Sequence, residues 1–423
     1  MKILVIGGGG REHALAWKLA QSPATSKLYA APGNPGIATL AECVPANVTD
    51  PDCLLAIAES AGIDLTVVGP EAPLAAGVVD VFRSRGLPIV GPIQSAARLE
   101  SSKGFAKEVM IQAGVPTARS VTVESVAEAH AAIRRFEFPV VLKADGLAAG
   151  KGVVIANTRE EAKRTAEAML AGELVGNAGR RLLVEEFLKG EEVSFIAITD
   201  GRTVIPLEAT QDHKAIFDGD RGPNTGGMGA YCDGRILPPS ATEDVLSTVV
   251  LPVVEYMRDK EEPFTGFLYA GLMLTEDGPK VLEFNVRLGD PETQALMMRL
   301  NSDLASLLLT CARGALSGIR PGWSTDPSVC VVMAAAGYPG QVRTGDPITG
   351  IAEAERDGAV VFHAGTACVN GEVRTAGGRV LGVTASGADL PAAIARTYDA
   401  VGRIRFEGAH YRTDIGVKGL KRW

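Results

Sequence analysis

A short apolar stretch in the second half of the chain carries three polar groups at alternate positions. Residues 281–292 read V-L-E-F-N-V-R-L-G-D-P-E, so Glu283, Asn285 and Arg287 are spaced two residues apart. Because the side chains of a strand alternate between its two faces, we expect these three groups on one face. The apolar residues expected on the opposite, core-facing side are Leu282, Phe284, Val286 and Leu288.

The three polar groups suit a polyphosphate that carries a metal ion. Mg²⁺ takes few protein oxygens and completes its shell with water and phosphate, while the fork of an arginine matches a phosphate or a carboxylate. The spacing therefore favours a metal-bound polyphosphate at Glu283 and Asn285, beside Arg287. A strand with one solvated face would show the same alternation, and this alternative stays open for the segment taken alone.

A glycine-rich loop lies between two β-rich runs in residues 140–154, V-V-L-K-A-D-G-L-A-A-G-K-G-V-V. Glycines let backbone N–H groups approach an anion closely, and lysines would supply positive charge at either end of the loop. The loop is not a Walker motif, because its Gly-Lys pair runs into a glycine and a strand rather than into Ser or Thr and a helix. A flexible hairpin turn is the alternative. The lysines are Lys143 and Lys151, and the glycines are Gly146, Gly150 and Gly152.

A third segment, residues 182–195, reads L-L-V-E-E-F-L-K-G-E-E-V-S-F and indicates a strand, a short connector and a second strand. The connector could offer backbone groups to the edge of a purine. Glu192 could accept hydrogen bonds from ribose hydroxyls. The segment thus adds a candidate nucleoside site to the candidate phosphate loop.

In this order along the chain, the loop at 143–152, the connector at 185–192 and the strand at 283–287 resemble the ATP-grasp enzymes. Further segments narrow the resemblance to the phosphoribosylamine–glycine ligase family, and it extends from Met1 to about Gly416. These segments are G-G-R-E-H-A-L-A-W at 9–17, A-P-G-N-P-G at 31–36, V-G-P-E-A-P-L at 68–74, T-Q-D-H-K at 210–214 and G-P-N-T-G-G-M-G-A-Y at 222–231.

The resemblance implies ATP-dependent amide formation in purine biosynthesis. Glycine's carboxylate would attack the γ-phosphate of ATP to give glycyl phosphate, and the amine of 5-phosphoribosylamine would then attack its carbonyl. Glycinamide ribonucleotide, ADP and phosphate would be the products. The cofactor would be Mg²⁺ or Mn²⁺, with ATP as a co-substrate, and the protein's task would be positioning and charge neutralisation.

Individual roles follow from the same resemblance. Glu283 and Asn285 would hold the metal, and Arg287 and Lys143 would be catalytic. Asp212 and Asp290 are candidates for the glycine ammonium, whereas His213 is expected to be structural. The residues implied for ATP are Lys103, Lys143, Gly150, Gly152, Glu185, Glu186, Phe187, Leu188 and Glu192. Those implied for the other substrates are Gly9, Arg11, Asn34, Glu71, Asp212, Gly226, Gly227 and Asp290, although Glu71 could also be an exposed loop acid.

The chain departs from the family pattern at Gly8, Val286 and Leu288, none of which removes a charge. The strand-like run at 267–274 carries no carboxylate, which leaves the number of metal ligands open. Three other functions remain open: a different ATP-grasp ligase or carboxylase, a dehydrogenase, and a non-catalytic nucleotide-binding protein. A dehydrogenase is disfavoured because Glu12 stands where the third glycine of the dinucleotide fingerprint belongs.

The elements that must position these residues suggest a multidomain chain of α/β and α+β character. Up to about Val90, strand and helix patterns alternate, with helices from about Glu12, over 51–61 and near 75–85, which predicts a parallel sheet with helices on both faces. We expect an N-terminal α/β domain, an ATP-grasp core with an inserted lid, and a small C-terminal α+β domain with a helix near 390–402. The predicted ranges are 1–101, 102–325 with the lid at about 122–190 and a lid helix near 160–171, and 326–423.

Composition agrees with a metabolic enzyme that acts on small molecules. The chain has 423 residues, 46% of them hydrophobic, and a net charge of −8. Its charged residues form no long run of like sign, which argues against a nucleic-acid or membrane partner. No signal peptide and no apolar run of ~18 residues is evident, so we expect a cytoplasmic protein. The six scattered cysteines predict reduced thiols. A monomer is expected, with a dimer as the alternative.

Overall fold

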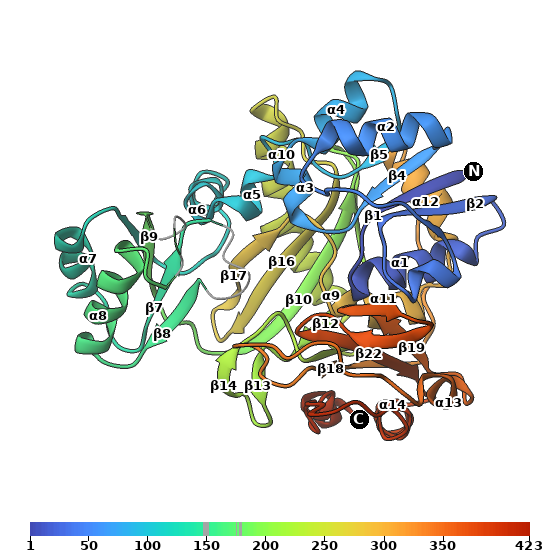
Figure 1. Ribbon diagram of the computed structural model, residues 1–423. Coiled ribbons are helices and arrows are strands. Elements are labelled where there is room, and N and C mark those ends of the chain that lie inside the picture. The colour runs from blue at the N-terminus through green and yellow to red at the C-terminus, as the bar shows by residue number, and fades with distance from the viewer. Residues whose placement is uncertain (147–151, 175, 177–179) are drawn as a thin grey trace.

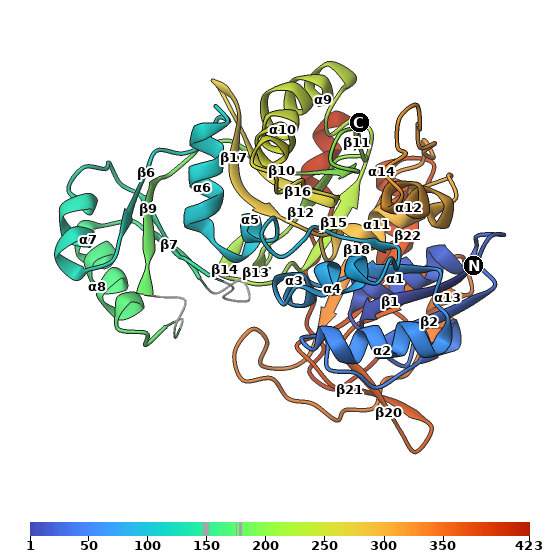
Figure 2. The same ribbon diagram turned by 90° about the horizontal axis from the view of Figure 1, so that it is seen from above.

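The computed structural model describes residues 1–146, 152–174, 176 and 180–423. The chain forms an N-terminal α/β part, a lid that stands to one side, and a large central sheet whose last strands belong to the C-terminal part (Figures 1 and 2). This arrangement confirms the predicted multidomain class. Within the described ranges, no helix is both long enough and apolar enough to cross a membrane.

The N-terminal part is a parallel sheet, as predicted, and its five strands lie in the order β3-β2-β1-β4-β5. Alternate residues of β1 enter different cores: Leu4 and Ile6 join the core that includes α2 and α4, and Ile3 and Val5 join the core that includes α1 and α12. Its strands are β1 (Lys2–Gly7), β2 (Lys27–Pro32), β3 (Glu42–Cys43), β4 (Leu65–Val68) and β5 (Ile89–Val90). Its helices are α1 (Gly10–Ala20), η1 (Ile37–Thr39), α2 (Pro51–Ala61), α3 (Glu71–Ala75) and α4 (Val78–Ser84).

The single helix predicted near 75–85 is two helices, α3 and α4. Gly77 separates them with a left-handed φ of 87°. A residue in that conformation cannot continue a right-handed helix, and glycine adopts it without a steric penalty. Helix α3 therefore ends before Gly77, and α4 begins after it. Helix α3 itself begins at Glu71, shortly after β4.

The lid is the segment from β6 to β9, an antiparallel sheet in the order β6-β9-β7-β8 with two helices packed on each other. It has a hydrophobic core of its own, which includes Ile133, Leu142 and Val184. The predicted lid helix is present, and the two strands of the hairpin predicted at 140–154 pair with each other, while loop residues 147–151, including Gly150 and Lys151, lie outside the described ranges. The lid elements are β6 (Ser120–Val123), α7 (Val126–Ile133), β7 (Val140–Ala144), β8 (Val153–Ala156), α8 (Arg159–Leu170) and β9 (Leu182–Glu186).

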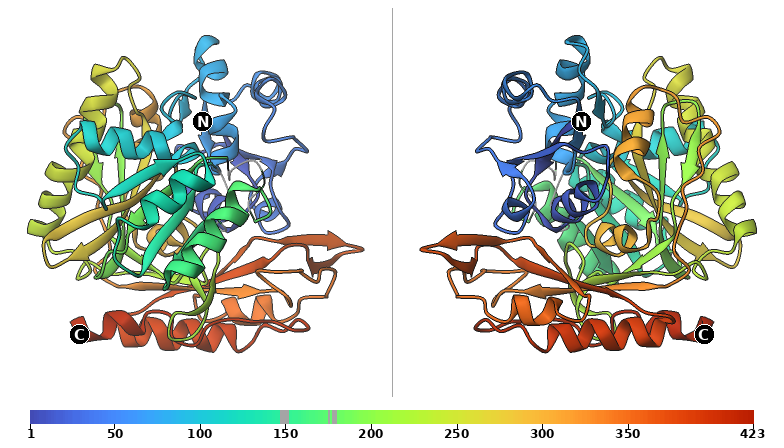
Figure 3. Two further views of the ribbon diagram at one scale, coloured as in Figure 1. Left: turned by 90° about the vertical axis from the view of Figure 1, so that its left-hand side faces the viewer. Right: turned by 90° about the vertical axis from the view of Figure 1, so that its right-hand side faces the viewer.

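A nine-stranded antiparallel sheet forms the centre, in the order β17-β16-β10-β12-β15-β18-β22-β19, with β11 paired to β10. Its strands are β10 (Glu191–Thr199), β11 (Val204–Pro206), β12 (Thr210–Asp212), β15 (Gly229–Cys232), β16 (Gly266–Thr275), β17 (Gly278–Asn285), β18 (Ser328–Ala334), β19 (Val360–His363) and β22 (Arg379–Ser386). Helix α14 runs along the underside of the C-terminal strands (Figure 3). The predicted C-terminal α+β part therefore shares one sheet with the predicted catalytic core.

The remaining elements cover this sheet or extend from it as hairpins. The hairpins pair β13 (Ala215–Phe217) with β14 (Arg221–Asn224), and β20 (Thr366–Val369) with β21 (Glu372–Thr375). The helices are α5 (Arg98–Ser101), α6 (Lys103–Gln112), α9 (Pro239–Val245), η3 (Leu246–Val250), α10 (Leu251–Asp259), α11 (Glu292–Arg299), α12 (Leu304–Ala312), α13 (Ile351–Glu355), α14 (Leu390–Val401) and η4 (Val417–Arg422).

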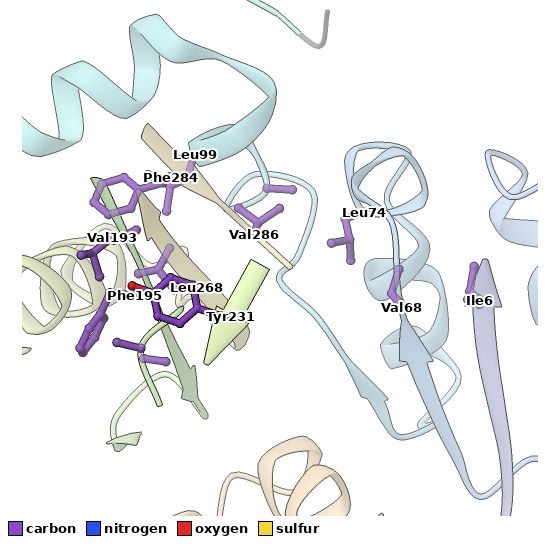
Figure 4. Close-up of a cluster of buried hydrophobic side chains, with 14 of the residues drawn as sticks. Ile6, Val68, Leu74, Leu99, Val193, Phe195, Tyr231, Leu268, Phe284 and Val286 are labelled. Carbon is purple, nitrogen blue, oxygen red and sulfur yellow. The ribbon is translucent and has the colours of Figure 1, made fainter. Parts of the chain in front are cut away.

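The strand that carries Glu283 is held by the largest core, but not with the regular alternation predicted for it. Phe284 and Val286 are buried in that core near Leu99 of α5 (Figure 4). A bulge, where Gly271 pairs with Glu283 and the next residue with Val281, leaves Leu282 without an opposing residue. The prediction that Leu282 faces the same core is therefore wrong: it is half-buried in a separate apolar cluster.

Candidate active site

Two buried lysines share one buried acid where the lid meets the core. Lys143 Nζ lies 2.7 Å from Glu185 Oε2, and Lys107 Nζ lies 2.9 Å from Glu185 Oε1. Burial raises the pKa of Glu185, but the two lysines outweigh it and hold this pKa below its usual value. Lys143 also donates to the carbonyl of Leu282 at 2.7 Å. Glu185, predicted as an ATP residue, is thus the counter-ion that fixes Lys143 at the loop.

Lys103 approaches the same loop from the opposite side. It is the first residue of α6, whose N-cap Ser102 accepts from the N–H of Phe105. Its Nζ donates to the carbonyl of Gly146 at 3.2 Å. Burial lowers the pKa of Lys103. Lys103 and Lys143 therefore lie together at the start of the hairpin loop. The sequence predicts Lys143 and Lys151 at the two ends of this loop, and Lys151 lies outside the described ranges.

A third lysine, Lys214, connects the acids on either side of the site and was not assigned a role from sequence. Its Nζ lies 3.2 Å from Glu192 Oε2 and 3.8 Å from Glu283 Oε1. These two acids hold the pKa of Lys214 well above its usual value despite burial. Burial raises the pKa of Glu283, but the positive charges of Lys214, Lys143 and Lys103 outweigh it and lower this pKa below its usual value. The sequence signal for Lys214 was its place at the end of the T-Q-D-H-K segment.

Glu283 and Asn285 fit a metal ion that arrives with phosphate ligands. The Glu283 side chain is 34% exposed, and Asn285 Oδ1 receives only a long contact of 3.4 Å from Arg287. The described ranges contain no group of three or more His, Cys, Asp or Glu residues placed to hold a metal. Two protein oxygens, with phosphate and water completing the shell, is the usual arrangement for Mg²⁺ at nucleotide sites.

Arg287 lies on the same side as Glu283 and Asn285, as predicted, just beyond the end of β17. Its guanidinium is clamped by two acids, with Glu100 Oε1 at 2.7 Å and Glu71 Oε2 at 3.2 Å. Glu100 also accepts from the N–H of Val286 at 2.8 Å, which ties the strand end to α5. Glu71 opens α3 and is not a free loop acid. Glu100 was missed because nothing in its local sequence marks it as a partner of Arg287.

An apolar cluster lies beside the connector between β9 and β10. It consists of Ala118, Leu188, Met273 and Leu282. Its walls come from the connector and the two strands β16 and β17, so it adjoins Lys143, Glu283 and Glu192. The N–H of Glu186 is already bonded to the carbonyl of Arg119 at 3.0 Å, and its carboxylate pairs with the Arg119 side chain.

Asp212 at the end of β12 has a buried oxygen, Oδ1, that meets no hydrogen-bond partner among the described residues. Burial, with a contribution from Glu292, raises the pKa of Asp212 well above its usual value. A Cβ built on Gly227 would lie 2.9 Å from that oxygen and 2.6 Å from Pro291 Cδ, so only glycine fits there. A buried acid with a free acceptor is suited to receive a cation.

Asp290 differs from Asp212 because its carboxylate is occupied. Gln294 Nε2 donates to it at 2.8 Å, and Arg379 Nη2 lies 3.2 Å away. Burial raises the pKa of Asp290, but the charges of Arg379 and Arg11 bring it below its usual value. Arg379, from the C-terminal part, was not predicted.

The N-terminal loops reach the same region but bond largely to each other. The N–H of Gly9 donates to Glu12 Oε2 at 2.6 Å, and Arg11 pairs with Glu12 and donates to the carbonyl of Leu288 at 3.0 Å. Asn34 donates to the carbonyls of Gly8 and His363, at 2.9 and 2.8 Å. Gly9, Arg11 and Asn34 thus fix the shape of the loops where α1 meets the core.

His213 follows Asp212 and is fully buried. Its Nδ1 lies 3.3 Å from the carbonyl of Gly229, and burial lowers its pKa to about 3. The imidazole is therefore neutral near pH 7. This environment agrees with the structural role that the sequence predicts.

Three family models match successive parts of the chain. Residues 1–100 match the phosphoribosylglycinamide synthetase N domain, residues 101–293 the ATP-grasp (A) domain, and residues 328–418 the C domain. The chain is 51% identical to a phosphoribosylamine–glycine ligase from Ralstonia nicotianae, over all of both chains. It is 48% identical to one from Brucella melitensis, over all of this chain and 99% of the relative.

Solved structures show the same similarity. A phosphoribosylamine–glycine ligase from Thermotoga maritima superposes with a TM-score of 0.87 and 34% identity, covering 98% of this chain and 100% of that one. A biotin carboxylase from Campylobacter jejuni, 14% identical, reaches a TM-score of 0.76 over 99% of this chain and 95% of its own. The second likeness concerns the fold alone.

Proposed function

The chain belongs to the phosphoribosylglycinamide synthetase family, and from that premise we propose how its residues divide the work of joining glycine to phosphoribosylamine. It is an ATP-dependent ligase that forms a carbon–nitrogen bond, with ATP converted to ADP and phosphate and with Mg²⁺ or Mn²⁺ as cofactor. The step belongs to purine biosynthesis.

The reaction runs through glycyl phosphate, since a free carboxylate is a poor acyl donor. A glycine carboxylate oxygen bonds to the γ-phosphorus, and ADP leaves with the bridging oxygen. The amine of phosphoribosylamine then attacks the carbonyl carbon, phosphate departs, and the amine proton is lost. Such a transfer needs little covalent chemistry from the protein and depends on positioning and charge.

Three lysines neutralise the phosphates. Lys103 and Lys143 flank the start of the glycine-rich loop, where the contact of Lys143 with Glu185 keeps its ammonium aimed into the site. Gly150 and Gly152 belong to the same loop as predicted phosphate contacts. Lys214 exchanges its present acid partners for phosphate when the nucleotide binds. A bound Mg²⁺ at Glu283 and Asn285 would screen charge on the phosphates.

The apolar cluster of Ala118, Leu188, Met273 and Leu282 receives the adenine ring. The cluster adjoins Lys143, which donates to the carbonyl of Leu282. Glu186 at the end of β9 and Phe187 at the start of the connector precede Leu188 in the chain. Glu192, half exposed at the start of β10, accepts from the ribose hydroxyls. The bulge in β17 is what turns Leu282 toward this cluster.

Glycine binds between Asp212 and Arg287. The unpartnered oxygen of Asp212 accepts the ammonium, and Arg287 takes the carboxylate in place of one of its present acids, Glu71. Asp290, Gly226 and Gly227 form the adjoining wall. Phosphoribosylamine lies toward the N-terminal loops of Gly9, Arg11 and Asn34, on the far side of Arg287, so its amine meets the acyl phosphate from that direction.

We further propose that the enzyme works as a monomer in the cytoplasm on small-molecule substrates alone. The absence of long like-charge runs and the net charge of −8 support the absence of a nucleic-acid partner. Sedimentation of the purified protein at micromolar concentration would test the oligomeric state, because a dimer has twice the mass.

The observation that carries the assignment of roles is the convergence of three lysines, Lys103, Lys143 and Lys214, on Glu283, whose pKa they lower together. The test is ADP release with Mg-ATP, with and without glycine and freshly generated phosphoribosylamine, for the wild type and Glu283→Ala. Glu276→Ala, which removes an exposed acid in the turn before β17, is the control. The proposal is supported if ADP release needs both substrates, persists in the wild type and in Glu276→Ala, and is lost in Glu283→Ala. ADP release driven by another acid or amine refutes it.

A further inference from the structure

Arg379 is the first residue of β22, and its guanidinium bonds to two loops that line the substrate side of the site. Its Nη1 donates to the carbonyls of Gly226, of Gly227 at 3.4 Å and of Asp290 at 2.6 Å. Its Nη2 pairs with the Asp290 carboxylate at 3.2 Å. One guanidinium therefore spans two segments that are more than sixty residues apart in the chain.

These two loops come from different edges of the site. Gly226 and Gly227 lie between β14 and β15, and a Cβ on Gly227 would contact both Asp212 and Pro291. Asp290 precedes α11 and accepts from Gln294 on that helix. Arg379 therefore holds together two loops that also pack directly on each other at Gly227 and Pro291, beside the free oxygen of Asp212.

The N-terminal part is packed against the same junction. A Cβ on Gly9 would lie 3.6 Å from Asp290 Oδ2, and a Cβ on Gly10 would lie 2.6 Å from Gln294 Nε2. The start of α1 therefore rests directly on Asp290 and Gln294. Residues from the N-terminal part, the core and the C-terminal part meet at one carboxylate.

We propose that Arg379 is a positioning residue that fixes the Gly226–Gly227 loop against Asp290 and thereby holds the glycine and phosphoribosylamine pockets in register across the three parts of the chain. This inference rests on the proposed function, because it takes these loops as the substrate side. It assigns no contact between Arg379 and a substrate.

A lysine cannot reproduce this arrangement. The planar guanidinium presents donors in fixed directions, so it reaches several carbonyls and a carboxylate at once, whereas an ammonium is a point charge on a flexible stem. Arg379→Lys should keep the attraction to Asp290 and lose most of the carbonyl contacts. Its effect should therefore lie between those of the wild type and Arg379→Gln.

The test compares Arg379→Gln and Arg379→Lys with Arg396→Gln in steady-state assays that vary ATP, glycine and phosphoribosylamine separately. Arg396 is a matched control because it donates to the carbonyls of Ser386, at the other end of β22, and of Asp357, away from the substrate loops. We expect Arg379→Gln to lower kcat/KM for glycine and phosphoribosylamine together by roughly 10- to 100-fold, the usual effect of a small misplacement. The KM for ATP should stay unchanged, and Arg396→Gln should change no KM.

Other results overturn the inference. Equal losses of kcat in the Arg379 and Arg396 variants, with every KM unchanged, would mean that Arg379 only stabilises the fold. A rise confined to the KM of phosphoribosylamine would mean that Arg379 binds that substrate itself. If Arg379→Gln does not fold, Arg379→Lys tests the inference instead: an intermediate loss of kcat/KM for glycine and phosphoribosylamine supports it, and unchanged kcat/KM values overturn it. Wild-type protein without glycine-dependent ADP release would refute the proposed function, an outcome separate from all of these.

Discussion

At the scale of single residues, the site is a set of charges that are paired before any substrate binds. Glu185 holds two lysines, and Arg287 holds Glu71 and Glu100. Pairing is the condition under which charges are tolerated away from water. The buried oxygen of Asp212, which has no partner among the described residues, is the exception and is the acceptor that we assign to the glycine ammonium.

Asp212→Asn should raise the KM for glycine about 10-fold or more, because a hydrogen bond to a charged group contributes about 1.5–3 kcal/mol. The KM for ATP should change little, since Asp212 faces the other substrate. Steady-state ADP release at varied glycine measures both constants. Asp259→Asn, the same change at an exposed position on α10, is the control. An unchanged glycine KM in Asp212→Asn would remove the ammonium role.

The same substitution should stabilise the ligand-free protein. The pKa of Asp212 is raised above the usual 3.8, so the unfolded chain ionises first as the pH rises and the folded state loses stability relative to it. Asp212→Asn should therefore exceed the wild type in unfolding free energy at pH 7, because the variant has no carboxylate to ionise.

The difference should shrink as the pH falls through the raised pKa and vanish below about the usual value. Urea unfolding at pH 4, 5.5, 7 and 8 follows this change. A wild type as stable as Asp212→Asn at pH 7 would show that the carboxylate is compensated in the folded protein.

At the scale of elements, the lid is a small domain with its own core, joined to the rest through β6 and the connector after β9. Ile133 of α7 is buried in that core, whereas Val126 on the same helix is exposed. Closure of such a segment over a nucleotide excludes water from the acyl phosphate. Because the lid has a core of its own, we expect it to loosen while the central sheet stays folded.

Ile133→Ala should destabilise the lid by about 2–5 kcal/mol, the usual cost of such a cavity. Hydrogen exchange measured by mass spectrometry should become faster in β6, β7 and β9 and stay unchanged in β10 and β16. Val126→Ala, as control, should leave both regions unchanged. Faster exchange throughout the chain would mean that the lid and the core unfold as one unit.

The elements themselves were largely predictable, because strand alternation and glycine-rich turns are local signals. The parallel N-terminal sheet, the hairpin that carries Lys143 and the helix near 390–402 were predicted and are present. The bulge at Leu282 was not, because it depends on how β16 pairs with β17. The local sequence of a strand does not show in which register a neighbouring strand will pair with it, so it does not show the position of a bulge.

The site was predictable only where a residue belongs to a recognisable segment. Lys107, Glu100 and Arg379 were missed because each acts through a partner that is distant in sequence: Glu185, Arg287 and Asp290. Conversely, Arg11 and Asn34 stand in conspicuous motifs, yet their side chains bond mainly to neighbouring loops. A motif identifies a loop more reliably than it identifies the contact that each side chain makes.

At the scale of the whole molecule, the N-terminal part docks on the central sheet through a close backbone approach. A Cβ on Gly266, which starts β16, would lie 2.8 Å from the Cα of Gly91, and Thr265 donates to the carbonyl of Gly91 at 2.8 Å. Glycine also meets the requirement for a positive φ of 92° at Gly266. The two parts can separate only if this contact breaks.

Gly266→Ala should lower the unfolding free energy by about 2–5 kcal/mol, combining a strained φ with overpacking. Gly314→Ala is a matched control, because Gly314 also has a positive φ, of 70°, but a Cβ there would meet nothing within 4 Å. It should show the strain alone, about 1–2 kcal/mol. Thermal unfolding of the two variants separates the effects, and equal losses would show that the Gly91 contact contributes nothing.

Because a single sheet crosses from the core into the C-terminal part, the parts of the chain must fold in a certain order during synthesis. A growing chain can complete the N-terminal sheet from residues 2–90 alone, but β15 has no partner on one edge until β18, which begins at Ser328, has been made. An unpaired edge is prone to join other chains. A message truncated shortly before the codon for Ser328 should therefore yield aggregated polypeptide with an intact N-terminal fold, rather than a shortened enzyme with a working nucleotide site.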